Sequence, residues 1–406
     1  MPVLGIISEY NPYHGGHALL LEKAKEMTGA AHAVSVMSGC FSQQGLPMIR
    51  DKYLRASAAA AEGLDLVFEL PTLFATGSAR DFAGGAVALL SAFGTDALCF
   101  GVETPDPSLF DEIAGLIVEE PEAFRTILKE EQKKGESYPA ARETAIASIL
   151  GDTVRSFLRE PNNILALEYV TAIKRQNSSM RPCYIQRTTD YHCGPGGSAT
   201  AIRNHMTALR EDGSTDPAGY LEQVLPAGSY HTYHPYRDRF LLSPEGLMPY
   251  LASRMLELPE ELPKEELPMD LTTEMYRRLR KLTLPSDYET VLNGLKRKNE
   301  TRGRISRSLL HLILGIREKD RITFPEDSGL PLYLNLLAGR KDSTSLLRDR
   351  DGISIITKKA AFTPADPVTK RMWELDIRAA TLYSQLLYDA CGDTLPGELQ
   401  RTPIIM

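Results

Sequence analysis

The stretch that most constrains the fold is residues 3–28, VLGIISEYNPYHGGHALLLEKAKEMT, which predicts a strand, a turn and a helix in succession. Residues 3–7 form a short apolar run with β-branched members, a pattern typical of a buried strand. Pro12 interrupts it, because proline has no amide donor and restricts the residue before it. From His17 onward apolar residues recur at helical spacing, so the string His14-Gly15-Gly16-His17 stands at the entrance of a helix.

This helix entrance has the chemistry of a phosphate-binding site. A helix N-terminus offers unpaired amides and a partial positive charge, and Gly15 and Gly16 let a ligand approach the backbone closely. His14 and His17 share one face, from which they can donate hydrogen bonds to a phosphate whose charge grows during transfer. Ordinary histidines of a surface turn are the alternative for a single histidine. Two of them around a glycine pair favour a nucleotide site.

Strands and helices alternate through the first half of the chain. Further strands are predicted at 33–38, 64–71, 95–103 and 181–192, with helices at 50–61 and 79–93. This alternation predicts an α/β fold with a Rossmann-like parallel sheet. Such sheets bind ligands beyond the carboxyl ends of their strands, which is where Ser8–His17 and Gly101 are expected. For Gly101 alone, a structural turn is an equal alternative.

Three later segments complete the predicted first domain. Residues 107–149 are helical with charged faces and are expected to form an insertion or lid. Pro161-Asn162-Asn163 begins a helix with asparagine at the cap positions, and capping alone would explain one asparagine. Ser198 is a natural N-cap of the helix that carries Arg203, and this helix end would present its amides to an anion. The sequence contains no GxxxxGK[ST] loop and no GxGxxG in a suitable context, which argues against a P-loop nucleotide-binding protein and against a dinucleotide-binding fold.

Composition bounds the remaining possibilities. A chain of 406 residues with 43% hydrophobic residues favours two domains, and a net charge of −7 argues against a polyanion-binding surface over the whole protein. Residues 277–307 nevertheless carry ten Lys/Arg against three Asp/Glu. Such asymmetry can create a local nucleic-acid footprint, although ordinary solvated side chains are the alternative.

In the second half of the chain, helices are predicted at 271–281, 286–298 and 302–317, a strand at 352–358 and a last helix near 368–389.

The cysteines and the hydropathy pattern indicate a cytoplasmic protein. The five cysteines are scattered without CxxC spacing and are typical of reduced thiols. His192-Cys193 is the single Cys/His neighbour pair, too few ligands for a zinc site. The sequence shows no leader segment and no apolar run of transmembrane length. We expect no structural metal, no membrane association and no protein partner.

A family resemblance follows from these motifs. Asn-Pro-x-His-x-Gly-His at 11–17 looks like the HxGH signature of adenylyltransferases related to class I aminoacyl-tRNA synthetases. The longer string at 9–17 resembles the bacterial tRNA(Met) cytidine acetate ligase family. Later segments agree with it in order, namely MSGCFSQQG at 37–45, DLVFELP at 65–71, GVE at 101–103, PNN at 161–163 and SATAIR at 198–203. The second half of the chain matches more diffusely.

The resemblance implies an ATP site and its residues. The ATP-binding residues would be Ile7, Ser8, Glu9, Tyr10, Asn11, Pro12, Tyr13, His14, Gly15, Gly16, His17, Ala18, Leu19, Leu20, Gly101, Asn162, Arg187 and Thr188. His14, His17, Ser198 and Arg203 would be catalytic, with Mg²⁺ held by the phosphates. Related adenylyltransferases carry a Ser-Ser-Thr type segment near the β- and γ-phosphates, whereas Ala199 here lacks one of those hydroxyls.

The resemblance also implies a substrate and a domain plan. Residues 1–210, with a helical insertion at 107–150, would form the ATP-binding nucleotidyltransferase-like domain, and residues 211–406 a mainly helical domain that binds tRNA. The tRNA contacts would be Arg277, Arg278, Lys281, Lys296, Arg297 and Lys298. The function implied is an ATP-dependent ligase that forms acetyl-adenylate and transfers acetyl to the wobble cytidine of elongator tRNA(Met). A small-molecule adenylyltransferase and a non-catalytic, ATP-sensing RNA-binding protein are the alternatives.

Overall fold

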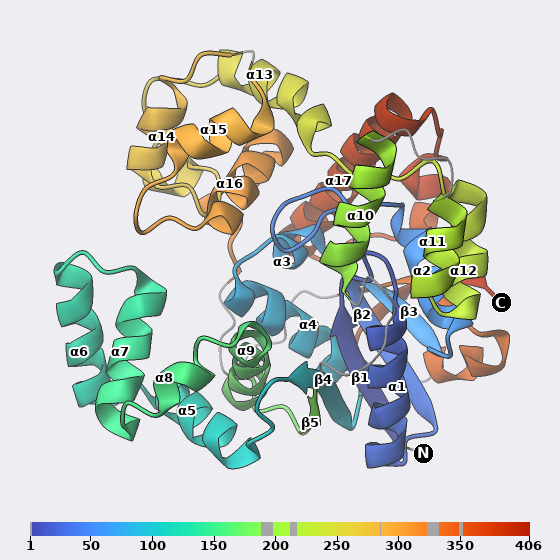
Figure 1. Ribbon diagram of the computed structural model, residues 1–406, viewed down its shortest axis with the longest axis horizontal. Helices are drawn as coiled ribbons and strands as arrows, with labels where there is room; N and C mark the ends of the chain where they lie inside the picture. Colours follow the sequence, from blue (N-terminus) through green and yellow to red (C-terminus); the bar gives the residue numbers. More distant parts are fainter. Residues whose placement is uncertain (1, 188–197, 212–216, 285, 323–332, 349–351) are drawn as a thin grey trace.

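A computed structural model describes residues 2–187, 198–211, 217–284, 286–322, 333–348 and 352–406 (Figure 1). Within these residues one sheet of eight strands has the order β5-β4-β1-β2-β3-β6-β7, with β8 also paired to β6. The strands are β1 (Val3–Ser8), β2 (His32–Ser38), β3 (Leu66–Leu70), β4 (Ala97–Val102), β5 (Arg181–Gln186), β6 (Tyr333–Gly339), β7 (Ser354–Ile356) and β8 (Ile404–Ile405). The predicted α/β fold is confirmed.

The first five strands run parallel, as the alternation of strands and helices predicts. Strand β1 lies between β2 and β4, so that Ile6 is in register with Ser35 on one side and Cys99 on the other. The helices of this part are α1 (Gly15–Thr28), α2 (Lys52–Ala61), α3 (Thr72–Ala75), α4 (Ala79–Phe93), α9 (Pro161–Arg175) and α10 (Ala199–Glu211). The carboxyl ends of β1 and β4 therefore lie at the same edge of the sheet.

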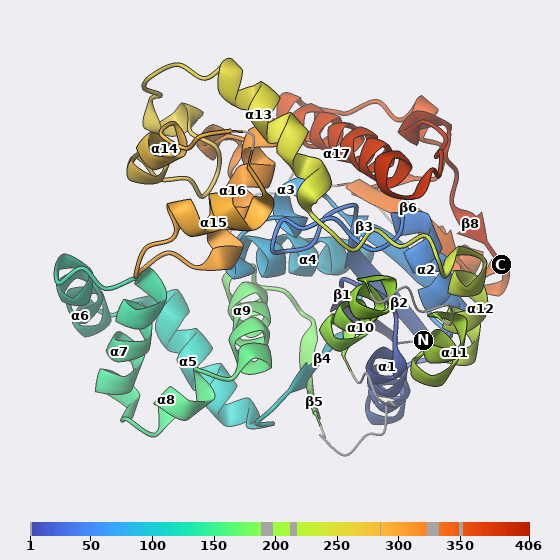
Figure 2. The ribbon, with the colours of Figure 1, turned by 45° about the horizontal axis from the view of Figure 1, so that its top comes forward.

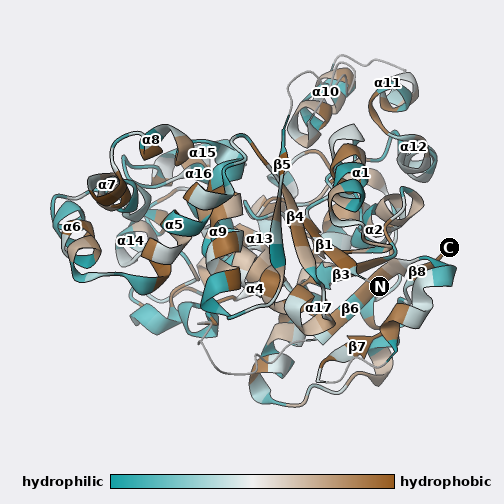
Figure 3. Ribbon diagram, turned by 90° about the horizontal axis from the view of Figure 1, so that it is seen from below, coloured by the Kyte–Doolittle hydropathy of each residue, from teal (hydrophilic) through white to brown (hydrophobic). Residues whose placement is uncertain are grey.

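Helices cover both faces of the sheet, because successive strand residues point to opposite sides. Leu4 and Ile6 belong to a core cluster that includes residues of α1, α2 and α10. Val34 and Val36 belong to the other cluster, which includes residues of α4 and α9. Figure 3 shows the strands of the sheet between helices that carry both hydrophobic and hydrophilic residues.

The C-terminal half returns to this sheet. Strand β6 pairs antiparallel with β3, and β7 and β8 pair parallel with β6. The helices of this half are α11 (Pro217–Val224), α12 (Ala227–Tyr233), α13 (Met248–Leu256), α14 (Thr273–Leu279), α15 (Tyr288–Leu295), α16 (Arg302–Leu314) and α17 (Pro367–Cys391). The expected helices and the expected strand near 352–358 are present. The division at residue 210 stays a prediction, and the sheet takes strands from both sides of it.

Two helical groups lie on the side of α4 and α9 that faces away from α1 (Figures 1 and 2). The first is α5 (Pro107–Glu119), α6 (Glu122–Lys133), α7 (Tyr138–Leu150) and α8 (Val154–Phe157), which matches the expected helical segment. The second is α13–α16. Among the described residues, no helix has the length and apolarity that a membrane span requires.

Candidate active site

The turn between β1 and α1 is held by its own two histidines. His14 is the N-cap of α1, and its Nδ1 accepts a hydrogen bond from the amide of Gly16 at 3.1 Å. The Nδ1 of His17 accepts in return from the amide of His14 at 3.2 Å. A backbone amide can only donate, so each Nδ1 is unprotonated and the ring proton of each neutral imidazole lies on Nε2.

Burial keeps both histidines neutral. Desolvation, followed by the charges of Arg187 and Arg203, lowers the pKa of His14 from its ordinary value to about 4. Burial and then the neighbouring His14 place the pKa of His17 well below its ordinary value. The two ring centroids are 4.0 Å apart. Near neutral pH the pair therefore offers two uncharged N–H donors beside a helix N-terminus.

A cleft of about 910 Å³ opens over the carboxyl ends of β1 and β4. Arg203 lines it, and so do ten of the expected ATP-binding residues, namely Ile7, Ser8, Glu9, Tyr10, Asn11, His17, Leu20, Gly101, Asn162 and Arg187. The other described members of that set lie in the same turn or helix but outside the cleft lining, namely Pro12, Tyr13, His14, Gly15, Gly16, Ala18 and Leu19. Thr188 lies outside the described residues.

The start of α9 forms one wall of this cleft. Asn162 donates from Nδ2 to Oε1 of Glu103 at 2.5 Å, and its own Oδ1 accepts from Arg187 at 3.4 Å. The expectation that asparagine caps this helix is wrong. Glu160 is the N-cap residue and makes no side-chain capping bond, since Pro161 already occupies the first turn and the asparagine side chains turn toward Glu103 and its neighbours.

Gly101 lies directly beside the side chain of Arg187. A Cβ on Gly101 would lie 3.1 Å from Cγ of Arg187, so that a larger residue would require this arginine side chain to shift by a few tenths of an ångström. The carboxyl ends of β4 and β5 are adjacent, with Gly101 in register with Ile185. The glycine thus lets the Arg187 side chain cross the end of β4.

Helix α10 supplies the opposite wall. Arg203 donates from Nη1 to the carbonyl of Asn11 at 2.7 Å and from Nη2 to Oγ1 of Thr200 at 3.1 Å. Burial lowers the pKa of Arg203, but a guanidinium stays charged. Ser198 accepts from the amide of Ala201 at 3.2 Å, as an N-cap does. Its side chain is exposed and outside the cleft lining, so its catalytic role stays a prediction.

Sequence reasoning gave Arg55 no role, although it organises the floor of the site. Its guanidinium is fully buried and donates to the carbonyl of Glu9 at 2.5 Å, to that of Ser38 at 3.1 Å and to that of Gly39. It thereby ties the ends of β1 and β2 together. Its place in helix α2, where six of the ten residues are alanine or serine, was the available signal in the sequence.

Comparisons with known proteins agree with this geometry. Residues 1–394 match the model of the HIGH Nucleotidyl Transferase family. A tRNA(Met) cytidine acetate ligase of Acetivibrio thermocellus is 34% identical over 399 residues, covering 94% of each chain. One of Bacillus subtilis is 33% identical over 398 residues, covering 95% of this chain and 92% of that protein.

This chain belongs to the tRNA(Met) cytidine acetate ligase family of HIGH nucleotidyl transferases. The resemblance inferred from the motifs is confirmed. A crystal structure of Thermotoga maritima TmcAL bound with alpha-thio ATP superposes with a TM-score of 0.86 at 28% identity, with all of both chains covered. The family match thus extends over the helical second half as well as the nucleotide-binding sheet.

The basic residues expected to bind tRNA in this family member fall into two groups. Arg277, Lys281, Lys296, Arg297 and Lys298 are exposed on or beside α14 and α15. Arg278 differs, because its side chain is only 14% exposed and its Nη2 lies 2.6 Å from Oε1 of Glu300. That guanidinium is committed to an internal ion pair. The RNA contacts themselves stay a prediction.

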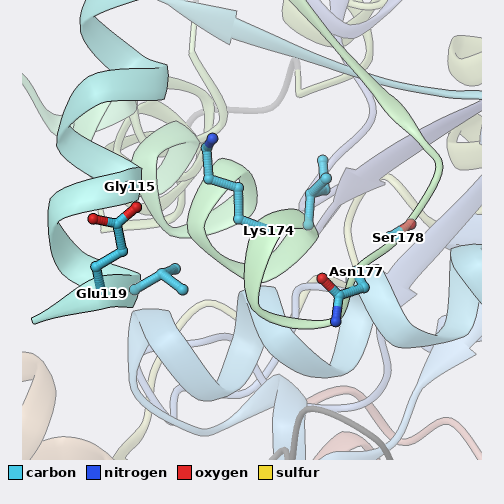
Figure 4. Close-up of a pocket in the computed structure, with 7 residues that line it drawn as sticks. Gly115, Glu119, Lys174, Asn177 and Ser178 are labelled. Carbon is cyan, nitrogen blue, oxygen red and sulfur yellow. The ribbon is translucent and has the colours of Figure 1, made fainter.

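Other hollows in this family member lie apart from the cleft. One of about 490 Å³ lies between α5 and the end of α9, lined by residues such as Glu119 and Lys174, and shares no lining residue with the cleft (Figure 4). Within the described residues, no group of three His, Cys, Asp or Glu side chains could hold a metal ion.

Proposed function

We propose that this chain is an ATP-dependent acetate ligase that acetylates the wobble cytidine of elongator tRNA(Met) to give N(4)-acetylcytidine. The observation that carries the proposal is the pair of neutral histidines, with ring protons on Nε2, at the entrance of α1 beside Arg203. The names of the relatives, tRNA(Met) cytidine acetate ligase, supply the substrate. The ATP analogue bound to the Thermotoga maritima protein supports ATP as the nucleotide.

The first step would make acetyl-adenylate. A carboxylate oxygen of acetate attacks the α-phosphorus of ATP, an oxygen–phosphorus bond forms and pyrophosphate leaves with the electrons of the broken bond. His17, the amides of the α1 N-terminus and Arg203 would stabilise the charge that grows on the phosphates. Arg187 would hold the nucleotide from the β5 side of the cleft.

The second step would transfer the acetyl group. The exocyclic amine of cytidine attacks the acetyl carbonyl, a carbon–nitrogen bond forms, AMP leaves and one amine proton passes to solvent. The base must stand outside a helix for this attack, which suits an anticodon loop. The exposed basic residues of α14 and α15 would hold the RNA backbone.

The described residues fit a magnesium ion only as a companion of the phosphates, because they offer no cluster of metal-ligating side chains. Such an ion neutralises phosphate charge when it is bound.

We place the reaction in the cytoplasm, because the cysteines of the described residues are all free thiols, as is usual in that reducing compartment.

The test is mass spectrometry of tRNA nucleosides after incubation of the purified protein with tRNA, ATP and acetate. Acetylcytidine that requires all three substrates is the expected result. ATP consumption with no change in the tRNA would favour a small-molecule adenylyltransferase. Tight tRNA binding with neither reaction would favour an ATP-sensing RNA-binding protein.

A further inference from the structure

Part of the cleft lining comes from two segments outside the residues expected to bind ATP, and we call this part the second arm of the cleft. Its lining comes from the segment 42–47, which includes Ser42, Gln43 and Leu46, and from the segment 241–244, which includes Leu242 and Ser243. These residues belong to the same cleft as His17 and Arg203. The arm is thus continuous with the place where an adenylate would form.

The arm has a defined shape because its two segments are tied together. Phe41 and Pro47 form an antiparallel bridge. Inside it the amide of Gly45 donates to the carbonyl of Ser42 at 2.8 Å, and that of Leu46 donates to Oγ of Ser42 at 3.1 Å. The amide of Leu241 donates to the carbonyl of Ile49 at 2.9 Å, which fixes the second segment beside this hairpin.

The hairpin also joins the adenylation site to the basic helices. At its inner end the amide of Gln43 donates to Oε1 of Glu9, the residue that follows β1, at 2.7 Å. At its tip Gly45, with φ +75°, lies against α16, where a Cβ would come within 2.8 Å of Cα of Arg307. The hairpin thus contacts both the residue that follows β1 and helix α16, which packs against the predicted RNA-binding helix α15.

The chemistry inside the arm fits one planar base with an exocyclic amine. Nε2 of Gln43 donates to the carbonyl of Gly77 at 3.0 Å, and because a carbonyl only accepts, the amide nitrogen must face Gly77. Its oxygen is left as an acceptor to which no described residue donates. Leu46 and Leu242 add apolar walls of the kind that receive a base turned out of its stack.

We propose that this second arm binds the acceptor cytosine, turned out of the anticodon loop, with Gln43 accepting a hydrogen bond from its exocyclic amine. One amine hydrogen would be held by Gln43 while the nitrogen faces the acetyl carbonyl. Uracil has a carbonyl in place of that amine and would meet the Gln43 oxygen with another acceptor. This inference rests on the proposed function.

Two variants test the arm, and a third serves as their control. Gln43→Leu removes the acceptor, and Ser243→Trp fills the mouth of the arm from an exposed position. Gln176→Leu is the matched control, because Nε2 of Gln176 also donates to a backbone carbonyl, that of Gly84 at 2.9 Å, but outside the cleft. Each variant is assayed for acetate-dependent ATP–pyrophosphate exchange and for acetylation of tRNA(Met).

We expect exchange within about threefold of wild type in all three variants. Acetylation should fall about tenfold in Gln43→Leu, the scale of one lost hydrogen bond, and further in Ser243→Trp. Equal losses of exchange and acetylation, or undiminished acetylation in both arm variants, would overturn the assignment. A wild-type protein that shows neither reaction would instead refute the proposed function.

Crosslinking can show independently which segments of the protein contact the acceptor cytosine. A tRNA(Met) anticodon stem-loop with 5-iodocytidine at the modified position is irradiated with the wild-type protein and ATP, and the crosslinked peptide is sequenced. The expected crosslinks lie in 42–47 or 241–244. Crosslinks confined to other segments would refute the proposed site.

Discussion

His14 and His17 cap the same helix reciprocally, each through its Nδ1, with their ring centroids 4.0 Å apart. The capping bonds involve neither Nε2 proton, and of the two residues His17 lines the cleft. These two hydrogen bonds therefore set both the entrance of α1 and the tautomer of the two rings, which couples the fold of this turn to its chemistry.

Replacing His17 with Ala should slow adenylation far more than it weakens ATP binding. Charge on the departing phosphates develops only in the transition state, and loss of one donor to it typically costs about 100- to 1000-fold in rate. Exchange kinetics and ATP titration measure the two quantities. Equal losses in both would show that the histidine serves only the fold of the turn.

The rate of adenylation should be nearly independent of histidine titration between pH 6 and 8. An imidazole with an ordinary pKa near 6.5 would change its neutral fraction about fourfold over this range, whereas the pKa of His14 is lowered to about 4. A pH profile of exchange with a step near 6.5 that disappears in His14→Asn would contradict this.

The same lowered pKa has a consequence for stability. In the folded protein His14 is harder to protonate than in the unfolded chain, where its pKa is ordinary. The contribution of neutral His14 to the free energy of unfolding is therefore complete above pH 6.5 and is lost as the pH falls toward about 4. His14→Asn keeps a capping oxygen without a titrating group. Denaturant unfolding of both proteins across this range should give a smaller pH slope for the variant. Equal slopes would mean that the pKa of His14 is ordinary.

Arg55→Met should destabilise the protein by about 3–5 kcal/mol, the scale of breaking a buried charged hydrogen-bond network. The reason is that the carbonyls of Glu9, Ser38 and Gly39 lose their donor in a buried site. Denaturant unfolding measures the change. Arg175→Met is a suitable control, because its guanidinium lies on α9, away from these strand ends. A loss no larger than that of the control would refute the organising role of Arg55.

The sequence predicts some residues of this site but not those whose roles depend on distant contacts. The histidine pair, Gly101 and Arg203 were predictable, because each lies at a strand end or helix start that local pattern identifies. Arg55 and the arm formed by 42–47 and 241–244 were not, because their roles depend on contacts between segments far apart in the chain. Strand β6 was missed for the same reason, since its pairing with β3 is antiparallel and distant in sequence.

Neutralising Arg277, Lys281 and Lys298 with Gln should weaken tRNA binding and flatten its salt dependence. Each phosphate contact removed should reduce the log–log slope by about 0.7 to 0.9. Arg278 is left intact because it pairs with Glu300. The control replaces Lys341, Lys358 and Lys370, three exposed lysines outside α13–α16. Equal slopes for the two triple variants would place the RNA surface elsewhere.

ATP–pyrophosphate exchange with the acyl donor varied tests the central claim most directly. Under the proposed function the site activates acetate by forming an adenylate, whereas a thioester is already activated. The purified protein is incubated with ATP and labelled pyrophosphate, with acetate, with acetyl-coenzyme A, or with neither. We predict exchange that requires acetate and saturates near millimolar concentration, since so small a ligand offers little binding area. Exchange that ignores acetate, or tRNA acetylation that occurs only with acetyl-coenzyme A, would contradict the account.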